Sequence, residues 1–141
     1  MSYGEKPFEA FRVGDATTFT KTITDADITL FAAVSGDNYP LHVDAEYAKT
    51  TRFGQRAAHG MLTASLLSTV VGLLLQKPGG IYVEQSIRFK RPVFIGDTLT
   101  ATAEVTELIA GRRRMRIRTR VGNHRGEAVL EGEGVIQKDE R

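Results

Sequence analysis

The chain has 141 residues, 41% of them hydrophobic, which is enough to bury the core of one globular domain without metals or cross-links. Cysteine is absent, which excludes disulfides, thiolate nucleophiles and cysteine zinc sites. The formal net charge of only +2 does not indicate nucleic acid or a membrane surface as a partner. We expect a single domain over residues 1–141.

The N-terminal segment, residues 1–11, is too polar and acidic for a signal peptide. The longest apolar stretch, Met61 to Leu75, is too short to span a bilayer. We therefore expect a cytoplasmic protein with no membrane partner.

The first predicted elements are a strand and a helix. The strand lies near Thr17 to Ile23, and the helix follows Thr24. Thr24 can form a capping box with Asp27 three residues later, and Gly36 can end the helix in a left-handed conformation. This helix delivers the chain directly to the most polar segment of the sequence.

That segment, SGDNYPLHVD (residues 35–44), places Asp37 and His42 five positions apart. A carboxylate and an imidazole are well suited to move protons near neutral pH. Pro40 between them is expected to block a continuous helix and to hold the chain extended, so that one stiff loop presents both groups. A second short helix is predicted from Asp44 to Thr51, with Asp44 as its N-cap.

The next element is a long apolar helix. About fifteen nearly all-apolar residues begin at Met61, and Lys77, Pro78 and two glycines end the run. A helix that is apolar on most sides must be buried on most sides. We expect it to form the core of the domain.

From Ile81 onward the apolar residues recur every second position, as in half-buried strands. Turn-like segments separate these runs. With the early strand they predict an α+β fold, in which about five antiparallel strands wrap around the apolar helix. The four later strands are Ile81–Lys90, Asp97–Glu107, Arg113–Val121 and Glu127–Gln137.

An arginine run, Arg112 to Arg120, has two interpretations. It resembles a nucleic-acid patch, but its arginines alternate with Met, Ile and Thr and so share one face of a strand. Glutamates on the next strand then form a solvated ladder of ion pairs, and this interpretation is preferred over nucleic-acid binding. If residues 122–125 close the hairpin, the pairs are Arg120 with Glu127, Arg116 with Glu131, and Arg114 with Glu133.

The three histidines differ in their surroundings. His124 lies in a predicted hairpin turn and is expected to be exposed. His59, at the entrance to the apolar helix, either bonds locally or lines the same pocket as His42, and the structural role is slightly favoured. A metal site is the other option for His42, but one Asp and one or two His without cysteine make a poor ligand set. Proton transfer is preferred, with no metal and no cofactor.

Three segments of the sequence resemble those of a known family. SGDNYPLHVDAEYA, AHGMLTASLLS and FKRPVFIGD are similar to segments of the MaoC-like, or hydratase-2, family of (R)-specific enoyl-CoA hydratases. The resemblance extends from Thr17 to Ile136. It implies the hot-dog fold, an antiparallel sheet around a long central helix, and a homodimer whose two sheets join edge to edge.

The family motif in this region is glycine, aspartate, any residue, asparagine, proline, an aliphatic residue and histidine. Tyr39 stands where the family has the asparagine that helps to arrange the loop, and a phenol cannot reproduce an amide. Asn38 precedes it, but in an extended segment its side chain points the other way. The departure bears most on substrate preference. The residues that match are Gly36, Asp37, Asn38, Pro40, Leu41 and His42.

The resemblance implies addition of water to a trans-2-enoyl-CoA thioester. Asp37 and His42 hold the water; His42 is the base, and Asp37 orients the water and relays a proton to C2. The backbone N–H of Gly60 stabilises the thioester oxygen, as the N-terminus of a helix favours an anion. Ser68 matches a family serine that bonds the aspartate, although a bond to its own helix is an equal alternative.

The substrate implied is an acyl-CoA, and Arg88, Lys90 and Arg91 are candidates to meet its phosphates. Two alternatives remain open. One is a hot-dog acyl-CoA thioesterase, in which a carboxylate directs water to the thioester carbonyl. The other is a non-catalytic acyl-binding subunit that depends on a catalytic partner. Neither the acyl-chain length nor the physiological direction follows from the sequence.

Overall fold

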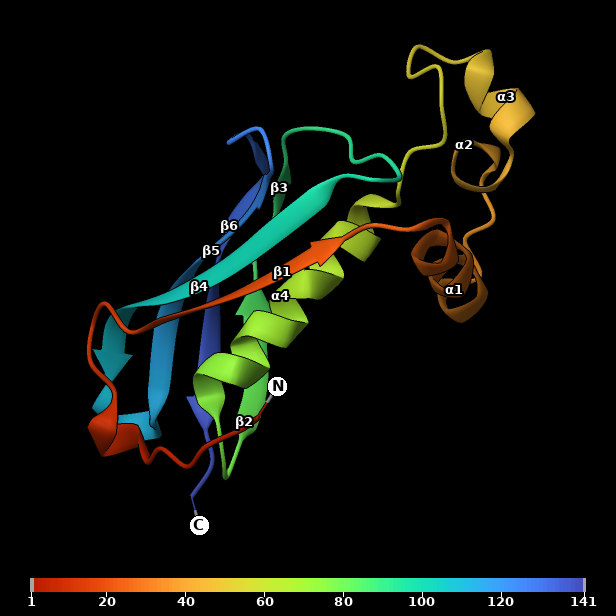
Figure 1. Ribbon diagram of the computed structural model, residues 1–141. Helices are drawn as coiled ribbons and strands as arrows, with labels where there is room; N and C mark the ends of the chain where they lie inside the picture. Colours follow the sequence, from red (N-terminus) through yellow and green to blue (C-terminus); the bar gives the residue numbers. More distant parts are fainter. Residues whose placement is uncertain (1, 141) are drawn as a thin grey trace.

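A computed structural model describes residues 2–140 and contains one antiparallel sheet of six strands (Figure 1). The strand order is β1-β4-β5-β6-β2, and the short strand β3 also pairs with β6. The predicted wrapping of a sheet around a helix is confirmed. The strands are β1 (Ala16–Thr22), β2 (Gly80–Gln85), β3 (Arg88–Phe89), β4 (Thr98–Ile109), β5 (Arg114–Asn123) and β6 (Ala128–Lys138).

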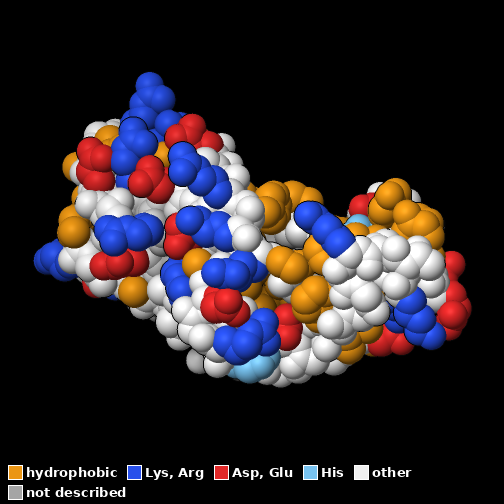
Figure 2. Space-filling view, turned by 90° about the horizontal axis from the view of Figure 1, so that it is seen from above, with side chains coloured by type: hydrophobic (Ala, Val, Ile, Leu, Met, Phe, Trp, Pro, Cys, Tyr) orange, Lys and Arg blue, Asp and Glu red, His pale blue; other side chains and the backbone are white. Residues whose placement is uncertain are grey.

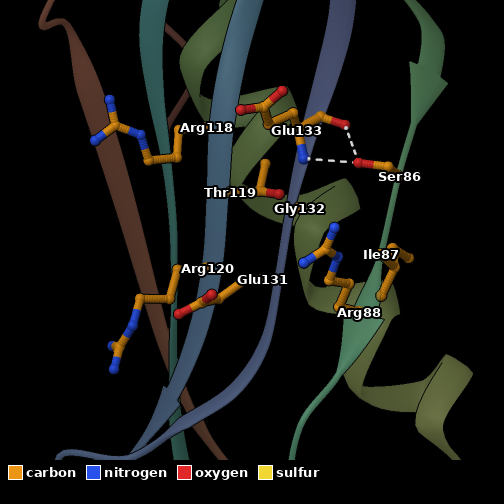
Figure 3. Close-up of a pocket in the computed structure, with 9 residues that line it drawn as sticks. All are labelled: Ser86, Ile87, Arg88, Arg118, Thr119, Arg120, Glu131, Gly132 and Glu133. Atoms are coloured by element: carbon orange, nitrogen blue, oxygen red, sulfur yellow. Dashed lines mark hydrogen bonds between the residues drawn. The ribbon is translucent and has the colours of Figure 1, made fainter.

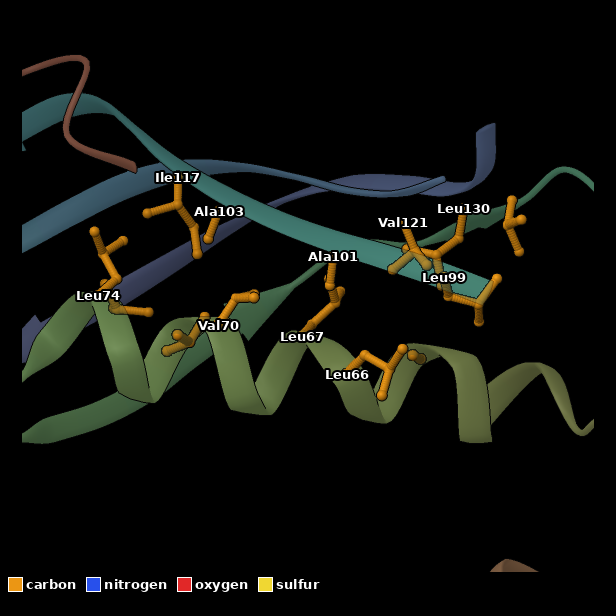
Figure 4. Close-up of a cluster of buried hydrophobic side chains, with 14 of the residues drawn as sticks. Leu66, Leu67, Val70, Leu74, Leu99, Ala101, Ala103, Ile117, Val121 and Leu130 are labelled. Atoms are coloured by element: carbon orange, nitrogen blue, oxygen red, sulfur yellow. The ribbon is translucent and has the colours of Figure 1, made fainter. Parts of the chain in front are cut away.

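The long helix α4 (Gly60–Leu75) lies in the curve of the sheet and forms the core, as the apolar run predicts (Figure 1). Its sheet-facing side chains pack against the inward faces of β4, β5 and β6 (Figure 4). This burial removes several large side chains from water. Each Å² of apolar surface that is buried stabilises the fold by about 25 cal/mol. The contacting residues include Leu66, Leu67, Val70 and Leu74 of the helix, and Leu99, Ala101, Ile117, Val121 and Leu130 of the strands.

Three shorter helices, α1 (Asp25–Ser35), α2 (Pro40–Val43) and α3 (Ala45–Lys49), form a lobe beyond the end of the sheet, beside the N-terminus of α4 (Figure 1). The capping box between Thr24 and Asp27 is present. Gly36 has a φ of 79° and ends α1 in the left-handed conformation. The predicted N-cap of the next helix, Asp44, accepts from two backbone N–H groups of α3. None of the helices in residues 2–140 is long and apolar enough to cross a membrane.

The expectation of an extended loop at Pro40 was wrong. Pro40 is the first residue of helix α2, and His42 sits in that helical turn. The fixed φ of proline suits the first turn of a helix, where its missing N–H group costs nothing. Pro40 therefore does separate α1 from the next helix, but it begins a new helical turn instead of keeping the chain extended.

The strand predicted over Ile81–Lys90 is interrupted. A bulge lies between Tyr82 and Glu84, and the ladder is broken between β2 and β3. The alternation therefore changes phase, and Phe89, expected on the buried side, is 54% exposed. Its ring lies against the backbone of Gly60 instead.

The pairing predicted for the arginine strand was also wrong. Arg120 lies opposite Glu131, and Arg118 lies opposite Glu133, so the register is displaced by four residues along β6. The cause is a bulge between Val121 and Gly122 combined with a turn that bonds Asn123 to residue 127. The arginines still share the outer face of the sheet.

Arg116 illustrates how the outer-face charges are paired. It forms an ion pair with Glu107 of β4 at 3.0 Å, on the side away from β6. Glu131 and Glu127 pair instead with Lys90 and Arg91, at 3.4 and 3.2 Å.

The C-terminal end of α4 is held by a buried lysine that the strand pattern did not single out. Lys138 of β6 is fully buried, and its ammonium donates to the carbonyls of Leu75, Gln76 and Lys77. These carbonyls belong to the last turn and exit of the helix, where the helix itself supplies no donor and a cation is favoured. Lys138 thus fastens the core helix to the sheet.

We predict that Lys138→Met lowers the free energy of unfolding by about 1 to 3 kcal/mol, because buried carbonyls lose their donor. Urea denaturation followed by circular dichroism measures the change. The matched control is Lys49→Met, since Lys49 is exposed and pairs with Glu46 on the surface of α3. The control is expected to stay within about 0.5 kcal/mol of the wild type. Equal effects of the two substitutions would show that Lys138 does not hold the helix.

Candidate active site

Asp37 follows α1 directly, and the backbone around it sets the direction of its carboxylate. Its N–H group donates to the hydroxyl of Ser35 at 3.1 Å, and its Oδ1 accepts from the N–H group of Tyr39 at 3.1 Å. The second bond is a local turn of the kind that aspartate favours. Because Tyr39 contributes its backbone, this bond does not require the asparagine side chain that the family motif has at this position.

His42 has one ring nitrogen bonded and the other available. Its Nδ1 lies 2.7 Å from the carbonyl oxygen of Ala57, and a carbonyl can only accept, so Nδ1 carries the proton. Nε2 of the neutral ring therefore has a free lone pair, as a general base requires. Arg56 holds the same turn by donating to the carbonyl of His42 at 2.7 Å and by pairing with Asp25 at 2.9 Å.

His59 belongs to the same cluster. Its ring stacks on that of His42 with centroids 3.9 Å apart and an interplanar angle of 26°. Its Nε2 lies 3.0 Å from the backbone carbonyl of Asp37. The sequence suggested either a local role or a place in the pocket of His42, and the structure brings His59 into contact with both predicted catalytic residues.

One atom each of Asp37, His42 and His59 lies within 4.8 Å of the others, which raises the question of a metal. An imidazole binds a metal in the plane of its ring, along the lone pair. Two rings stacked face to face direct their lone pairs side by side, so they cannot converge on one ion without turning apart. The arrangement suits proton transfer better than metal binding.

Gly60 is the first residue of α4, so the helix supplies no partner for its N–H group. It lines a cavity of about 310 Å³ together with His42, Thr63 and Phe89. A Cβ atom at position 60 would lie only 3.0 Å from the ring of Phe89. The glycine therefore lets an aromatic ring and the start of the helix meet beside the imidazole.

The three basic residues predicted to meet CoA do not lie together. Lys90 and Arg91 line the cavity of His42 and Gly60. Arg88 lines a different hollow, of about 600 Å³, on the outer face of the sheet beside Arg118 and Glu131 (Figure 3).

The sequence reasoning missed Arg52, which lines the cavity of His42 and lies over the ring of Phe53 at 4.7 Å. Its position among the turns after α3 gave no periodic signal, so only the tertiary structure reveals it.

Ser68 and Asn38 are less closely connected to the cluster. Ser68 lies two turns into α4 and lines an apolar cavity of about 330 Å³ with Phe31 and Met61. Asn38 is exposed beside Asp37. The bond between Ser68 and Asp37 stays a prediction.

Tyr39 does not fill the place of an amide. Its ring is exposed and stands edge-on to His42 at 6.2 Å and to Tyr47 at 6.4 Å between centroids. A side-chain hydrogen bond with Tyr39 raises the pKa of the Tyr47 phenol. Tyr39 therefore borders the imidazole from the solvent side.

An antiparallel sheet curved around a central helix is the hot-dog fold, and here a carboxylate and an imidazole lie together beside the first turn of that helix. The model of the MaoC-like domain matches residues 11–127, and the chain belongs to this family. The family and the fold predicted from the motifs are thereby confirmed.

The relatives are similar to this chain over nearly its whole length. An (R)-specific enoyl-CoA hydratase of Rhodospirillum rubrum is 46% identical, covering 92% of this chain and 89% of its own. An unliganded R-hydratase of Pseudomonas aeruginosa has a TM-score of 0.89 at 44% identity, covering 96% of this chain and 86% of its own. The (R)-hydratase of Aeromonas caviae involved in PHA biosynthesis has a TM-score of 0.88 at 39% identity, covering 93% and 99%.

We predict that Gly60→Ala lowers kcat/KM for hydration of crotonyl-CoA by about 10- to 100-fold, because the new methyl group displaces the ring of Phe89 within the site. Adding Phe89→Ala makes room for the methyl group and is expected to recover part of the loss. Gly111→Ala is the matched control, since nothing lies within 4 Å of a Cβ atom there. A Gly60→Ala enzyme as active as the control would contradict this account.

Proposed function

We propose that this protein is an (R)-specific enoyl-CoA hydratase, which adds water to a trans-2-enoyl-CoA and dehydrates the 3-hydroxyacyl-CoA in the reverse direction. The observation that carries the proposal is the convergence of Asp37, the free Nε2 of His42 and the first turn of α4. The names of the relatives support the substrate class.

In this mechanism a water molecule binds between the carboxylate of Asp37 and Nε2 of His42. Nε2 takes a proton from the water as its oxygen bonds to C3, which makes water an adequate nucleophile. The Nδ1–H bond to Ala57 keeps the ring in the tautomer that can accept this proton.

The electrons of the double bond move toward the thioester oxygen, which gains negative charge. The N–H group of Gly60, supported by the helix dipole, is the donor that stabilises this charge. The proton held by Nε2 then passes to the carboxylate of Asp37 and from there to C2, which restores both groups, so one water supplies OH to C3 and H to C2. Because a single water serves both carbons, the addition is syn.

A non-catalytic subunit is an alternative because Tyr39 replaces the asparagine of the family motif. The backbone of Tyr39 still fixes the carboxylate of Asp37, and its side chain lies outside the acid–base pair. The backbone bond to Asp37 from this position is therefore present without an asparagine. A thioesterase differs from a hydratase in that it releases free CoA, and an assay for free thiol distinguishes the two.

We propose that the protein acts as a cytoplasmic homodimer. The α1–α3 lobe exposes large apolar side chains that a second copy can cover, with Val34 87% exposed. Figure 2 shows hydrophobic side chains gathered where this smaller lobe meets the larger, charged body. The edge strand β2 also has unpaired backbone groups on one side. Exposed apolar residues include Leu30, Val34 and Tyr39 in the lobe, Met61 in α4, Tyr82 in β2 and Phe89 in β3.

We predict that the purified protein removes the enoyl thioester absorbance of crotonyl-CoA without releasing free CoA. Absorbance and a thiol reagent followed together distinguish the candidates. Free thiol would identify a thioesterase, and no reaction with short or longer enoyl chains would refute the hydratase proposal.

The site assignment is checked in the same assay. Asp37→Asn and His42→Ala are each expected to lower kcat by about 100-fold or more. Asn keeps the oxygen that accepts from Tyr39, so the loop should hold its shape. His124→Gln is the matched control, because His124 is exposed in the β5–β6 turn. Near-normal rates in either variant would refute the assigned roles.

We predict that Arg52→Gln raises KM for crotonyl-CoA about two- to fivefold, because an exposed charge contributes up to about 1 kcal/mol to binding a phosphate. KM for crotonyl-pantetheine, which lacks the nucleotide, should not change. Arg88→Gln is the control, since Arg88 lines the other hollow. If Arg88→Gln raised KM and Arg52→Gln did not, CoA would bind along the outer face instead.

A further inference from the structure

The structure assigns to His59 the role of a positioning residue, which holds Asp37 and His42 in their reactive arrangement as a neutral ring protonated at Nε2. This assignment rests on the proposed function, because it concerns the same acid–base pair. His59 is 2% exposed and separated from solvent, so it acts through its neighbours and does not need to touch the substrate.

The hydrogen bonds determine the tautomer of His59. Its Nε2 meets the carbonyl oxygen of Asp37 at 3.0 Å, and this oxygen can only accept a proton. Its Nδ1 is buried and has no hydrogen-bond partner among the described residues. A proton on Nδ1 would be a buried donor without an acceptor, which is more costly than a lone pair left facing apolar atoms.

The bond to Asp37 connects the catalytic loop to the core helix. His59 immediately precedes Gly60, and its own carbonyl accepts from Leu62 and Thr63 in the first turn of α4. Asp37 lies at the end of α1, in the lobe beyond the sheet. The ring of His59 therefore fixes the distance between the carboxylate and the start of the helix, where Gly60 presents its N–H group.

The stack orients the other catalytic residue. His42 covers one side of the His59 ring at 3.9 Å, and Phe31 packs at 4.8 Å with a tilt of 51°. With Nδ1 bonded to Ala57, the remaining freedom of the His42 ring is a rotation that the stack opposes. When His42 takes the proton of water, the resulting cation faces a neutral aromatic ring and not a second positive charge.

Three substitutions separate the two contacts. His59→Phe keeps the stack and loses the bond to Asp37, His59→Gln keeps a donor and loses the stack, and His59→Leu loses both. Hydration of crotonyl-CoA is measured for each, with thermal unfolding to confirm that the variants are folded. His124→Gln is the control for loss of a histidine elsewhere.

We expect Phe and Gln to lower kcat about tenfold each and Leu about 100-fold, with KM within twofold of the wild type. A residue that only stabilises the fold would lower the melting temperature and leave kcat of the folded enzyme unchanged. Three variants with kcat within twofold of the wild type would overturn the assignment. So would a rise in KM at constant kcat.

Nitrogen NMR of the imidazoles tests the tautomers in the wild type, where only three histidines need to be assigned. Near neutral pH we expect His59 protonated at Nε2 and His42 at Nδ1. A His59 ring protonated at Nδ1, or at both nitrogens, would overturn the assignment even if every variant failed to fold. This readout needs no substrate, so it stands apart from a failure of the hydratase proposal.

Discussion

The burial of α4 in the curve of the sheet is the constraint on which the rest of the structure depends. Because its side chains are apolar, the helix must be covered, and the sheet that curves around it covers them. Lys138 holds one end of the helix by its carbonyls. The other end is thereby directed out of the sheet toward the lobe of α1, α2 and α3, and the helix begins there at Gly60, whose N–H group has no partner within the helix (Figure 1). The position proposed to stabilise an anion thus follows from packing a hydrophobic helix.

The proposed catalytic groups are attached to this end mainly through the backbone. Asp37 is held by Ser35 and by the N–H group of Tyr39, and His42 by the carbonyl of Ala57. Ala57 is itself bonded to the backbone of the α2 turn, so the segment before α4 and the catalytic turn form one unit. Backbone contacts of this kind tolerate a change of side chain. The bond from the N–H group of Tyr39 to Asp37 therefore does not depend on which side chain stands at position 39.

The outer face of the sheet and the lobe of short helices expose different kinds of side chain. The outer face of the sheet carries alternating arginines and glutamates, whose exposed ion pairs contribute little to stability but keep the face solvated. The lobe of short helices instead exposes apolar side chains around the site (Figure 2). Such a surface is typical of an interface, and its position beside His42 connects the proposed dimer with the proposed chemistry.

Local interactions were readable from the sequence alone. The capping box at Thr24, the left-handed Gly36, the buried helix and the pairing of Asp37 with His42 each depend on neighbours along the chain or on a regular period. The register of β5 against β6 was not readable, because the turn closes between Asn123 and residue 127 and a bulge at Val121 adds one further residue, which together moved every predicted ion pair. The stack of His59 on His42 and the place of Arg52 in the cavity join residues from separate segments. The sequence by itself determined which groups are candidates for the chemistry; only the tertiary structure decided what holds them, because those contacts depend on distances between segments that no local pattern encodes.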